Sequence, residues 1–411
     1  MNVAALQKID RWMGIPLCFM LTMFRKLTEF GPKRVGTPKN LLFVKLAEQG
    51  STVLAYPALV RAVEMVGREN VHFIVFDENR FILEALELIP KENIIAISFK
   101  SFPELITSSI QAVLRMRRLR FDATIDMEFF ARGSAAVAFL SGAKSRIGFH
   151  TYFGEGPYRG NLMTHRLLYN PYLHTSQIFQ LMVESVQKDP DSFPTFDMHP
   201  PSIGESFPQF ATKPEEHVAV QEILRRETRL EKTPPIILLN PNASDLLPLR
   251  RWPNERYVEL AKRLLKTFPE LHIAFTGTGS ESVKVNGMLE QIGSTRAFSL
   301  AGKTSLRQLL VCYFHSEILV TNDSGPAHFA SLTPINVVTL FGPETPSLFA
   351  ARTPRSTVLY ANVVCSPCVN AYNNRQSACK NNICMQQITV DQLFDTVSCV
   401  YRERRKNSVA T

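Results

Sequence analysis

Two short polar loops in the last third of the chain carry residue types that suit anion binding. They read Thr-Asn-Asp-Ser-Gly-Pro-Ala-His over residues 321–328 and Phe-Gly-Pro-Glu-Thr-Pro over residues 341–346. Each follows a short apolar run, which is typical of a buried parallel strand, and ligands bind beyond the carboxyl ends of such strands. Asp323 or Ser324 is expected to cap a helix that Pro326 opens. The free N–H groups at that helix start suit a diphosphate, although a plain capped turn would use the same residue types.

The rest of this loop extends the predicted diphosphate site. His328 lies about one helical turn beyond Ser324 and is expected to face the same anion, and Gly325 lies between them. Asp323 carries a negative charge, so we expect it to bind N–H groups or sugar hydroxyls rather than phosphate.

Two upstream segments accompany these loops, Leu-Asn-Pro-Asn-Ala-Ser over residues 239–244 and Arg-Arg-Trp-Pro over residues 250–253. Together the four segments resemble glycosyltransferase family 9, the lipopolysaccharide heptosyltransferase family. The resemblance covers roughly residues 39–397. It implies an α/β fold of the GT-B architecture, in which two Rossmann-like doubly wound domains face a cleft. It also implies an inverting glycosyltransferase that needs no bound metal and no cofactor.

Transfer from a nucleotide sugar requires cationic or hydrogen-bonding groups on the departing diphosphate. Arg250 and Arg251 are the candidate cations, and we favour Arg250 because it matches the family's basic residue before an aromatic-Pro pair. Solvated loop arginines are the alternative. Placed against the family, Asn242 and Ser244 would contact the phosphates, and Glu281 would hydrogen-bond the ribose or the base.

The catalytic base is the point at which this chain departs from the family. Heptosyltransferases place an Asp after the Gly of the first strand–helix loop, and this chain has Ser51 there. A serine hydroxyl is no general base near neutral pH without a partner, so Glu48 in the same loop is the predicted base, with a solvated carboxylate as the alternative. Asp126 and Glu128 follow another strand and are further candidates on the acceptor side. Arg146 would bind an anionic acceptor or tie down its loop.

The elements that must position these residues alternate between strand and helix, which predicts right-handed βαβ units and parallel sheets. A chain of 411 residues is too long for one core. Strands are expected at residues 41–44, 71–76, 94–97, 123–126, 236–240 and 271–276, with helices at 81–88 and 103–117, from 253, and at 389–402. The predicted domains are an N-terminal segment and linker (1–38), an acceptor domain (39–210), a donor domain (211–388), and a C-terminal helix and tail (389–411).

The N-terminal region carries an apolar run over residues 12–24 between Lys8, Arg11, Arg25 and Lys26. It is too short to span a bilayer, and its basic flanks suit a segment lying in the membrane interface. A helix packed on the chain's own surface explains it equally well. The net charge of +9 favours anionic partners, but no zinc-finger or RNA-recognition signature accompanies it, so nucleic acid is not expected. We expect a cytoplasmic protein with peripheral contact at the inner face of the membrane.

Four of the seven cysteines cluster late in the chain, at Cys365, Cys368, Cys379 and Cys384. Only the first pair has the two-residue spacing of a zinc knuckle. Zinc, disulfides and free thiols all remain alternatives for this cluster.

These observations predict transfer of a sugar, with ADP-heptose as the family's default donor, to a lipopolysaccharide-core or lipid-linked saccharide. Ser51 raises a non-catalytic nucleotide-sugar binder as an alternative. A nucleotide-sugar epimerase of similar fold is another.

Overall fold

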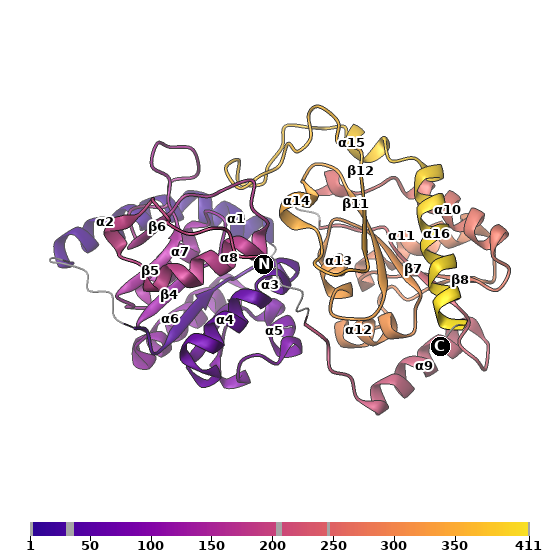
Figure 1. The fold of residues 1–411 in the computed structure, drawn as a ribbon, viewed down its shortest axis with the longest axis horizontal. Helices are drawn as coiled ribbons and strands as arrows, with labels where there is room; N and C mark the ends of the chain where they lie inside the picture. The colour runs from indigo at the N-terminus through magenta and orange to yellow at the C-terminus, as the bar shows by residue number, and fades with distance from the viewer. Residues whose placement is uncertain (1–2, 30–36, 203–207, 245–246, 410–411) are drawn as a thin grey trace. The chain divides into compact units, whose positions relative to one another are not determined.

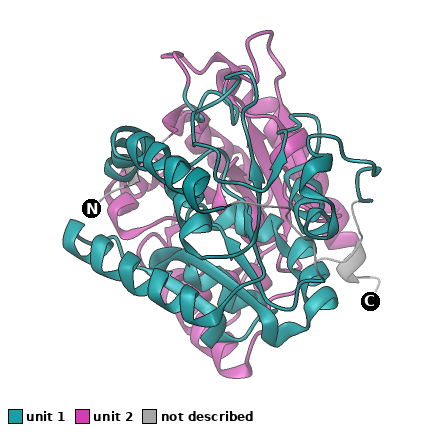
Figure 2. Ribbon diagram, turned by 90° about the vertical axis from the view of Figure 1, so that its left-hand side faces the viewer, with its two compact units in different colours: residues 1–206, 369–376 teal, residues 207–368, 377–411 magenta. Residues whose placement is uncertain are grey.

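The computed structural model describes residues 3–29, 37–202, 208–244 and 247–409. The chain forms two compact units, residues 1–206 with 369–376 (unit 1) and residues 207–368 with 377–411 (unit 2), which Figure 2 shows in two colours. Most of the predicted linker at residues 31–38 lies outside the described residues.

Unit 1 is built on a parallel sheet of six strands in the order β3-β2-β1-β4-β5-β6 (Figure 1). The strand residues are almost wholly buried, as expected where helices cover both faces of a parallel sheet. The strands are β1 (Leu41–Val44), β2 (Val71–Phe76), β3 (Ile94–Ile97), β4 (Ala123–Asp126), β5 (Ser145–Phe149) and β6 (His165–Leu167). The helices are α1 (Val3–Trp12), α2 (Gly14–Thr28), α3 (Gln49–Leu54), α4 (Tyr56–Val66), α5 (Arg80–Leu86), α6 (Phe102–Leu119), α7 (Arg132–Leu140) and α8 (Thr175–Glu184).

Unit 2 repeats the plan with strand order β12-β11-β10-β7-β8-β9, again parallel throughout. The predicted α/β, doubly wound fold is therefore confirmed. Its strands are β7 (Ile236–Asn240), β8 (His272–Phe275), β9 (Ala297–Ser299), β10 (Ile318–Asn322), β11 (Asn336–Phe341) and β12 (Ser356–Tyr360). Its helices are α9 (Pro214–Thr228), α10 (Asn254–Thr267), α11 (Ser282–Ile292), α12 (Leu306–Phe314), α13 (Gly325–Ala330), α14 (Pro346–Phe349), α15 (Ile383–Gln386) and α16 (Val390–Val409).

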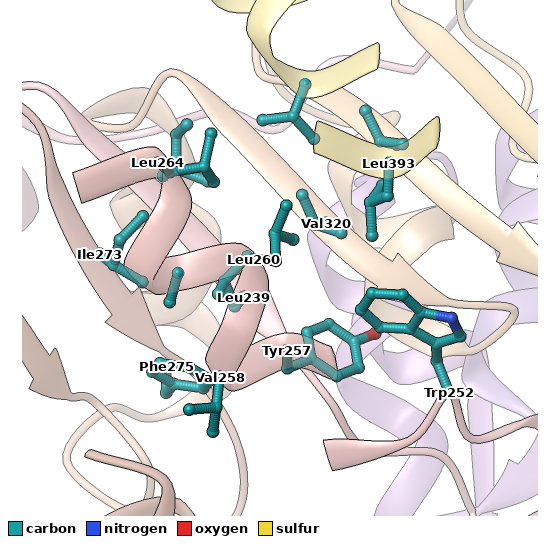
Figure 3. Packing of buried hydrophobic residues seen from close by; sticks show 14 of the residues in the cluster. Leu239, Trp252, Tyr257, Val258, Leu260, Leu264, Ile273, Phe275, Val320 and Leu393 are labelled. Carbon is teal, nitrogen blue, oxygen red and sulfur yellow. The ribbon is translucent and has the colours of Figure 1, made fainter. Parts of the chain in front are cut away.

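The core of unit 2 forms where α10 and α16 pack against the sheet, and Figure 3 shows Trp252 and Tyr257 side by side there. Their rings meet edge to face with centroids 5.0 Å apart. The indole N–H of Trp252 donates to the carbonyl of Ile388 at 2.9 Å, so this buried polar atom is satisfied. Burying two large aromatic side chains directly beside the Arg-Arg-Trp-Pro segment stabilises the loop that carries the arginines.

Residues 369–376 belong to unit 1 although the chain on either side belongs to unit 2. Tyr372 holds this segment by packing on Phe130 and Tyr169, and its hydroxyl donates to the carbonyl of Tyr169 at 2.7 Å. The domain limits expected from the sequence assigned these residues to the second domain.

The apolar run at residues 12–24 forms the end of α1 and most of α2. Helix α2 packs on α7. In the described part of the chain, no helix is both long enough and apolar enough to cross a membrane.

Candidate functional site

The polar loops of unit 2 come together because β10 lies between β7 and β11, so the carboxyl ends of all three strands meet at one edge of the sheet. Asn322, at the end of β10, has no exposed surface and fastens the neighbouring segments. Its side-chain amide donates to the carbonyl of Asn242 at 3.2 Å. Its oxygen accepts from the backbone N–H of Trp252 at 3.1 Å and from the hydroxyl of Tyr257 at 3.2 Å. The sequence reasoning missed this role, although Asn322 belongs to the loop it singled out.

Arg250 lies where these segments converge. One terminal nitrogen of its guanidinium is 3.6 Å from a carboxylate oxygen of Asp323 and 3.6 Å from one of Glu344. The two carboxylates are buried, and the arginine side chain is 14% exposed. The Nε–H of Arg250 is buried and has no hydrogen-bond partner in the described part of the chain. Glu344 was not predicted as a site residue, yet it comes from the Phe-Gly-Pro-Glu run.

Helix α13 begins at Gly325, one residue before the predicted Pro326, and the predicted side-chain cap by Ser324 is not formed. Ser324 occupies the N-cap position, and its side chain makes no capping hydrogen bond. Its hydroxyl instead donates to the carbonyl of Asn322 at 3.1 Å. Of the two predicted caps, Asp323 or Ser324, Ser324 therefore holds the N-cap position without a side-chain cap, because its oxygen accepts no hydrogen bond from an N–H of the first turn. His328 is buried on this helix, which spans six residues.

Arg251 differs from Arg250 in that its side-chain contacts are with the loop after β7. Arg251 donates twice to the carbonyl of Ala243, at 2.7 and 3.2 Å, and so stabilises the loop itself. The side-chain nitrogen of Asn242 is buried and has no partner among the described groups. Gly277 lies beside it, since a Cβ there would come within 2.9 Å of that nitrogen. Ser244 is exposed.

The Gly-rich loop after β8 forms a compact turn. Glu281 accepts from the backbone N–H of Thr278 at 2.7 Å and from its hydroxyl at 2.9 Å, which completes a capping box. Gly302, with φ of +71°, faces Gly279, and a Cβ on Gly302 would lie 2.8 Å from the Gly279 Cα. The predicted contact of Glu281 with the ribose or base stays a prediction.

In unit 1 the structure brings Glu48 and Ser51 together. Glu48 adopts a left-handed backbone with φ of 68°, which turns the chain sharply between β1 and α3. The Ser51 hydroxyl donates to the Glu48 carbonyl at 2.9 Å and lies 3.4 Å from a carboxylate oxygen of Glu48. The Glu48 side chain, 39% exposed, forms an ion pair with Arg375 and lies 4.0 Å from the ammonium of Lys45. Arg375 was not predicted, because it is distant in sequence.

The two other candidate carboxylates are held more tightly. Asp126 has no exposed surface, pairs with Arg159 and accepts a hydrogen bond from the Ser134 hydroxyl at 3.0 Å. Burial raises the pKa of Asp126, and the Arg159 charge opposes that shift. Glu128 accepts from Lys45 at 3.3 Å and from the N–H of Ala47 at 2.9 Å. A fully buried carboxylate cannot meet an acceptor hydroxyl without rearrangement, which argues against Asp126 as the base.

Arg146 is buried, and each nitrogen of its guanidinium donates one hydrogen bond within unit 1. It donates to the carbonyls of Leu162 and Ala143, each at 2.8 Å, and to the Glu29 carboxylate at 2.7 Å. Of its two predicted roles, these contacts favour tying down the loop.

The four clustered cysteines are free thiols that line one cavity of unit 2, together with Leu249, Pro343, Asn381, Asn382 and Ile383. Burial raises the pKa of the Cys384 thiol, and the neighbouring thiols raise it further. In residues 3–29, 37–202, 208–244 and 247–409, no three His, Cys, Asp or Glu side chains are placed to hold a metal ion. The four cysteines form no disulfide in the structure, and zinc or disulfide formation stays an alternative to free thiols.

Two doubly wound parallel sheets with polar loops at the carboxyl ends of their strands define an α/β protein of the GT-B class. Residues 111–378 match glycosyltransferase family 9 (heptosyltransferase), and the chain belongs to that family. It is 32% identical over 115 residues to lipopolysaccharide heptosyltransferase 2 of Salmonella typhimurium, which covers 27% of this chain and 32% of that protein. It is 25% identical over 155 residues to lipooligosaccharide heptosyltransferase 2 of Haemophilus influenzae, which covers 37% of this chain and 44% of that protein. The matches thus span less than half of either relative.

Solved structures share the fold over most of the chain. Heptosyltransferase II of E. coli superposes with a TM-score of 0.63 at 18% identity, covering 89% of this chain and 99% of that one. A family 9 glycosyltransferase from Veillonella parvula gives a TM-score of 0.66 at 17% identity, covering 89% and 97%. The GT-B fold expected from the sequence is confirmed.

Proposed function

We propose that this protein transfers a sugar, with heptose as the first candidate, from a nucleotide diphosphate to a lipopolysaccharide-core or lipid-linked saccharide. Arg250 is the observation that carries the proposal. The Arg-Arg-Trp-Pro segment supplies this cation, and the two loops that resemble family 9 each supply a carboxylate that holds it. Family membership and the heptosyltransferase relatives support the donor and acceptor classes.

Arg250 would act on the leaving group. As the bond between the anomeric carbon and the diphosphate oxygen breaks, negative charge grows on the diphosphate, and a fixed cation stabilises that charge more in the transition state than in the ground state. Asp323 and Glu344 attract the guanidinium from two loops, which favours one orientation of it and would lower the cost of orienting it during the reaction. We propose that this side chain serves the leaving group without a bound metal.

Glu48 would act on the acceptor. Its carboxylate would take the proton from the acceptor hydroxyl while that oxygen attacks the anomeric carbon from the face opposite the diphosphate, so the configuration inverts. Ser51 stands close enough to orient the carboxylate. We propose that the reaction takes place at the inner face of the cytoplasmic membrane, where α1 and α2 would make peripheral contact.

A transfer assay with a panel of nucleotide sugars and extracted glycolipid acceptors tests the proposal, with Arg250→Ala as the first variant. We expect kcat to fall about 100-fold with a much smaller change in donor affinity, because losing one stabilising group at a developing charge has an effect of that order. Arg226→Ala, an exposed arginine on α9, is the matched control. A loss confined to donor affinity would make Arg250 a binding contact only.

The same assay separates the alternatives. Binding of the donor without transfer to any acceptor would favour a non-catalytic protein, which is a specific concern because Ser51 replaces the family's Asp. A changed sugar configuration on the donor, without an acceptor, would identify an epimerase.

A further inference from the structure

Helix α2 buries its small side chains and exposes its large apolar ones, the reverse of an ordinary surface helix. Its buried residues are the small ones, Gly14, Cys18 and Thr22, spaced four residues apart on the side that meets α7. A Cβ on Gly14 would lie 2.7 Å from the Arg132 Cβ, so the two helices approach too closely for a larger residue there. The large apolar side chains lie on the other side, and Phe19, Met20 and Leu27 are exposed by 57%, 60% and 69%. Such a helix leaves its most hydrophobic side without a partner within the described chain.

Helix α6 presents a second apolar stripe of the same kind. Phe102, Ile106, Ile110 and Leu114 follow one another at four-residue spacing, and each is about half exposed. Four-residue spacing places side chains along one side of a helix. The opposite side of α6 contributes Ala112 and Met116 to the core beneath the sheet.

The two stripes belong to the same layer of unit 1. Right-handed crossovers from β3 through α6 to β4 and from β4 through α7 to β5 place α6 and α7 on one face of the sheet. Helix α7 contacts both α6 and α2, and Arg117 of α6 donates to the carbonyl of Leu140 in α7 at 2.7 Å. Helix α7 is largely buried and rich in small residues, and α2 and α6 both pack against it while their apolar stripes stay exposed. Figure 1 labels the three helices within this unit.

Exposed cations accompany both stripes. Arg11, near the end of α1, precedes the α2 stripe, and Lys26 lies near the end of α2. Arg118 and Arg120 lie at the end of the α6 stripe. The sequence of α2 contains no acidic residue and that of α6 contains one, Glu104. The positive charge matches an anionic surface, and the exposed Phe, Met, Leu and Ile side chains match its apolar interior.

We propose that the stripes of α2 and α6, with these cations, form one docking surface for an anionic lipid bilayer. The proposal rests on the function proposed above in one respect, namely that the acceptor is carried on a lipid. The surface extends well beyond the N-terminal segment, because α6 lies within the sheet-covering layer of unit 1. Helix α7 fills the space between α2 and α6, so no groove for a peptide lies between them in the described part of the chain, and a bilayer fits the two exposed helix faces and their cations.

Co-sedimentation of the full chain with phosphatidylcholine vesicles, with and without phosphatidylglycerol, tests the surface. The variants are Met20→Glu with Leu27→Glu on α2, and Ile110→Glu with Leu114→Glu on α6. We expect binding to the anionic vesicles to fall at least about 10-fold for each pair and further for the four changes together, since each places charge at an apolar contact. Val218→Glu, at a 57% exposed site on α9, should leave binding unchanged. Equal thermal stability of all variants shows that the changes act at the surface.

Unchanged binding by the α6 pair would overturn the two-helix surface. Loss of self-association in the variants, with vesicle binding unaltered, would also overturn it and assign the face to a second copy of the chain. Transfer assays separate this proposal from the proposed function: the variants should keep the wild-type kcat on a water-soluble, deacylated acceptor and lose activity only on an acceptor in vesicles. Vesicle binding by a wild-type protein that transfers no sugar would leave the docking surface standing and the proposed function refuted.

Discussion

The guanidinium of Arg250 carries one positive charge beside two buried carboxylates, and this arrangement determines what it can do for a diphosphate. Its charge is already compensated when no anion is bound, which lowers the cost of keeping it poorly solvated. Its buried Nε–H has no partner among the described groups, so an anion that reaches it gains a charge-assisted hydrogen bond. These properties favour a guanidinium that stabilises the diphosphate by its fixed orientation rather than by strong attraction to the bound donor.

Glu48 is the residue on which the proposed mechanism depends most. Glu48→Gln keeps the size and the hydrogen bonding of the side chain and removes its basicity, so kcat should fall by about 100-fold or more while the donor dissociation constant stays the same. Steady-state kinetics and donor titration measure the two quantities. Glu78→Gln, on the neighbouring loop after β2, is the control.

Near-normal turnover in Glu48→Gln would contradict the assignment and transfer the role to Glu128. Asp126 would be a poorer substitute, because it has no exposed surface and is held by Arg159.

At the scale of elements, the donor-side loops depend on strand order. Because β10 lies between β7 and β11, one residue at its end can reach the loop after β7 and the start of α10 at once. Asn322 does this with its side-chain amide. The side chain therefore couples the stability of the core around Trp252 to the geometry of the loop that carries Arg250.

Asn322→Ala should lower the free energy of unfolding by about 2–4 kcal/mol, because it removes the partners of the Asn242 carbonyl and the Trp252 N–H in the interior and one partner of the Tyr257 hydroxyl. Chemical denaturation measures this change. Donor affinity should fall as well, since Asn242 loses its anchor. Gln291→Ala, at an exposed position on α11, should change neither quantity, and an Asn322→Ala protein of wild-type stability would show that the loops are held by other contacts.

At the scale of the whole molecule, the division into two units allows ligand binding to be assigned to one of them. The chain has two tryptophans, the buried Trp252 in unit 2 and the 77% exposed Trp12 in unit 1. A Trp12→Phe protein therefore carries a fluorescence signal from unit 2 alone.

ADP at about 100 times its dissociation constant should stabilise unit 2 by about 2.7 kcal/mol, because a ligand that binds only the folded state shifts unfolding by mass action. Denaturant titration of the Trp12→Phe protein, followed by tryptophan fluorescence, measures the shift. Adenosine at the same concentration should stabilise unit 2 much less, since it lacks the diphosphate. Equal effects of ADP and adenosine would contradict a diphosphate site at Arg250.

Local patterns in the sequence were sufficient for the elements and for most of the fold. The apolar runs at residues 41–44 and 236–240 read as strands because burial on both faces requires continuous apolar side chains, and both are strands. The burial of Tyr257 and Leu264 on α10 followed from helical spacing, and the Thr389–Gln392 capping box followed from its two residue types. Arg250 and Asp323 could be named as candidates because their segments resemble family 9.

Only the tertiary structure decided which of these residues contact one another and which are buried away from a ligand. It joined Arg250 to Glu344, and Glu48 to Arg375, which lie 94 and 327 positions apart in the sequence and so leave no local signal. It buried Asp126 and gave each guanidinium nitrogen of Arg146 a hydrogen-bond acceptor within unit 1. It also turned the small side of α2 inward. Hydrophobic spacing shows that a helix has two sides, but the neighbouring elements determine which side is buried, and here the close approach of α7 selected Gly14, Cys18 and Thr22.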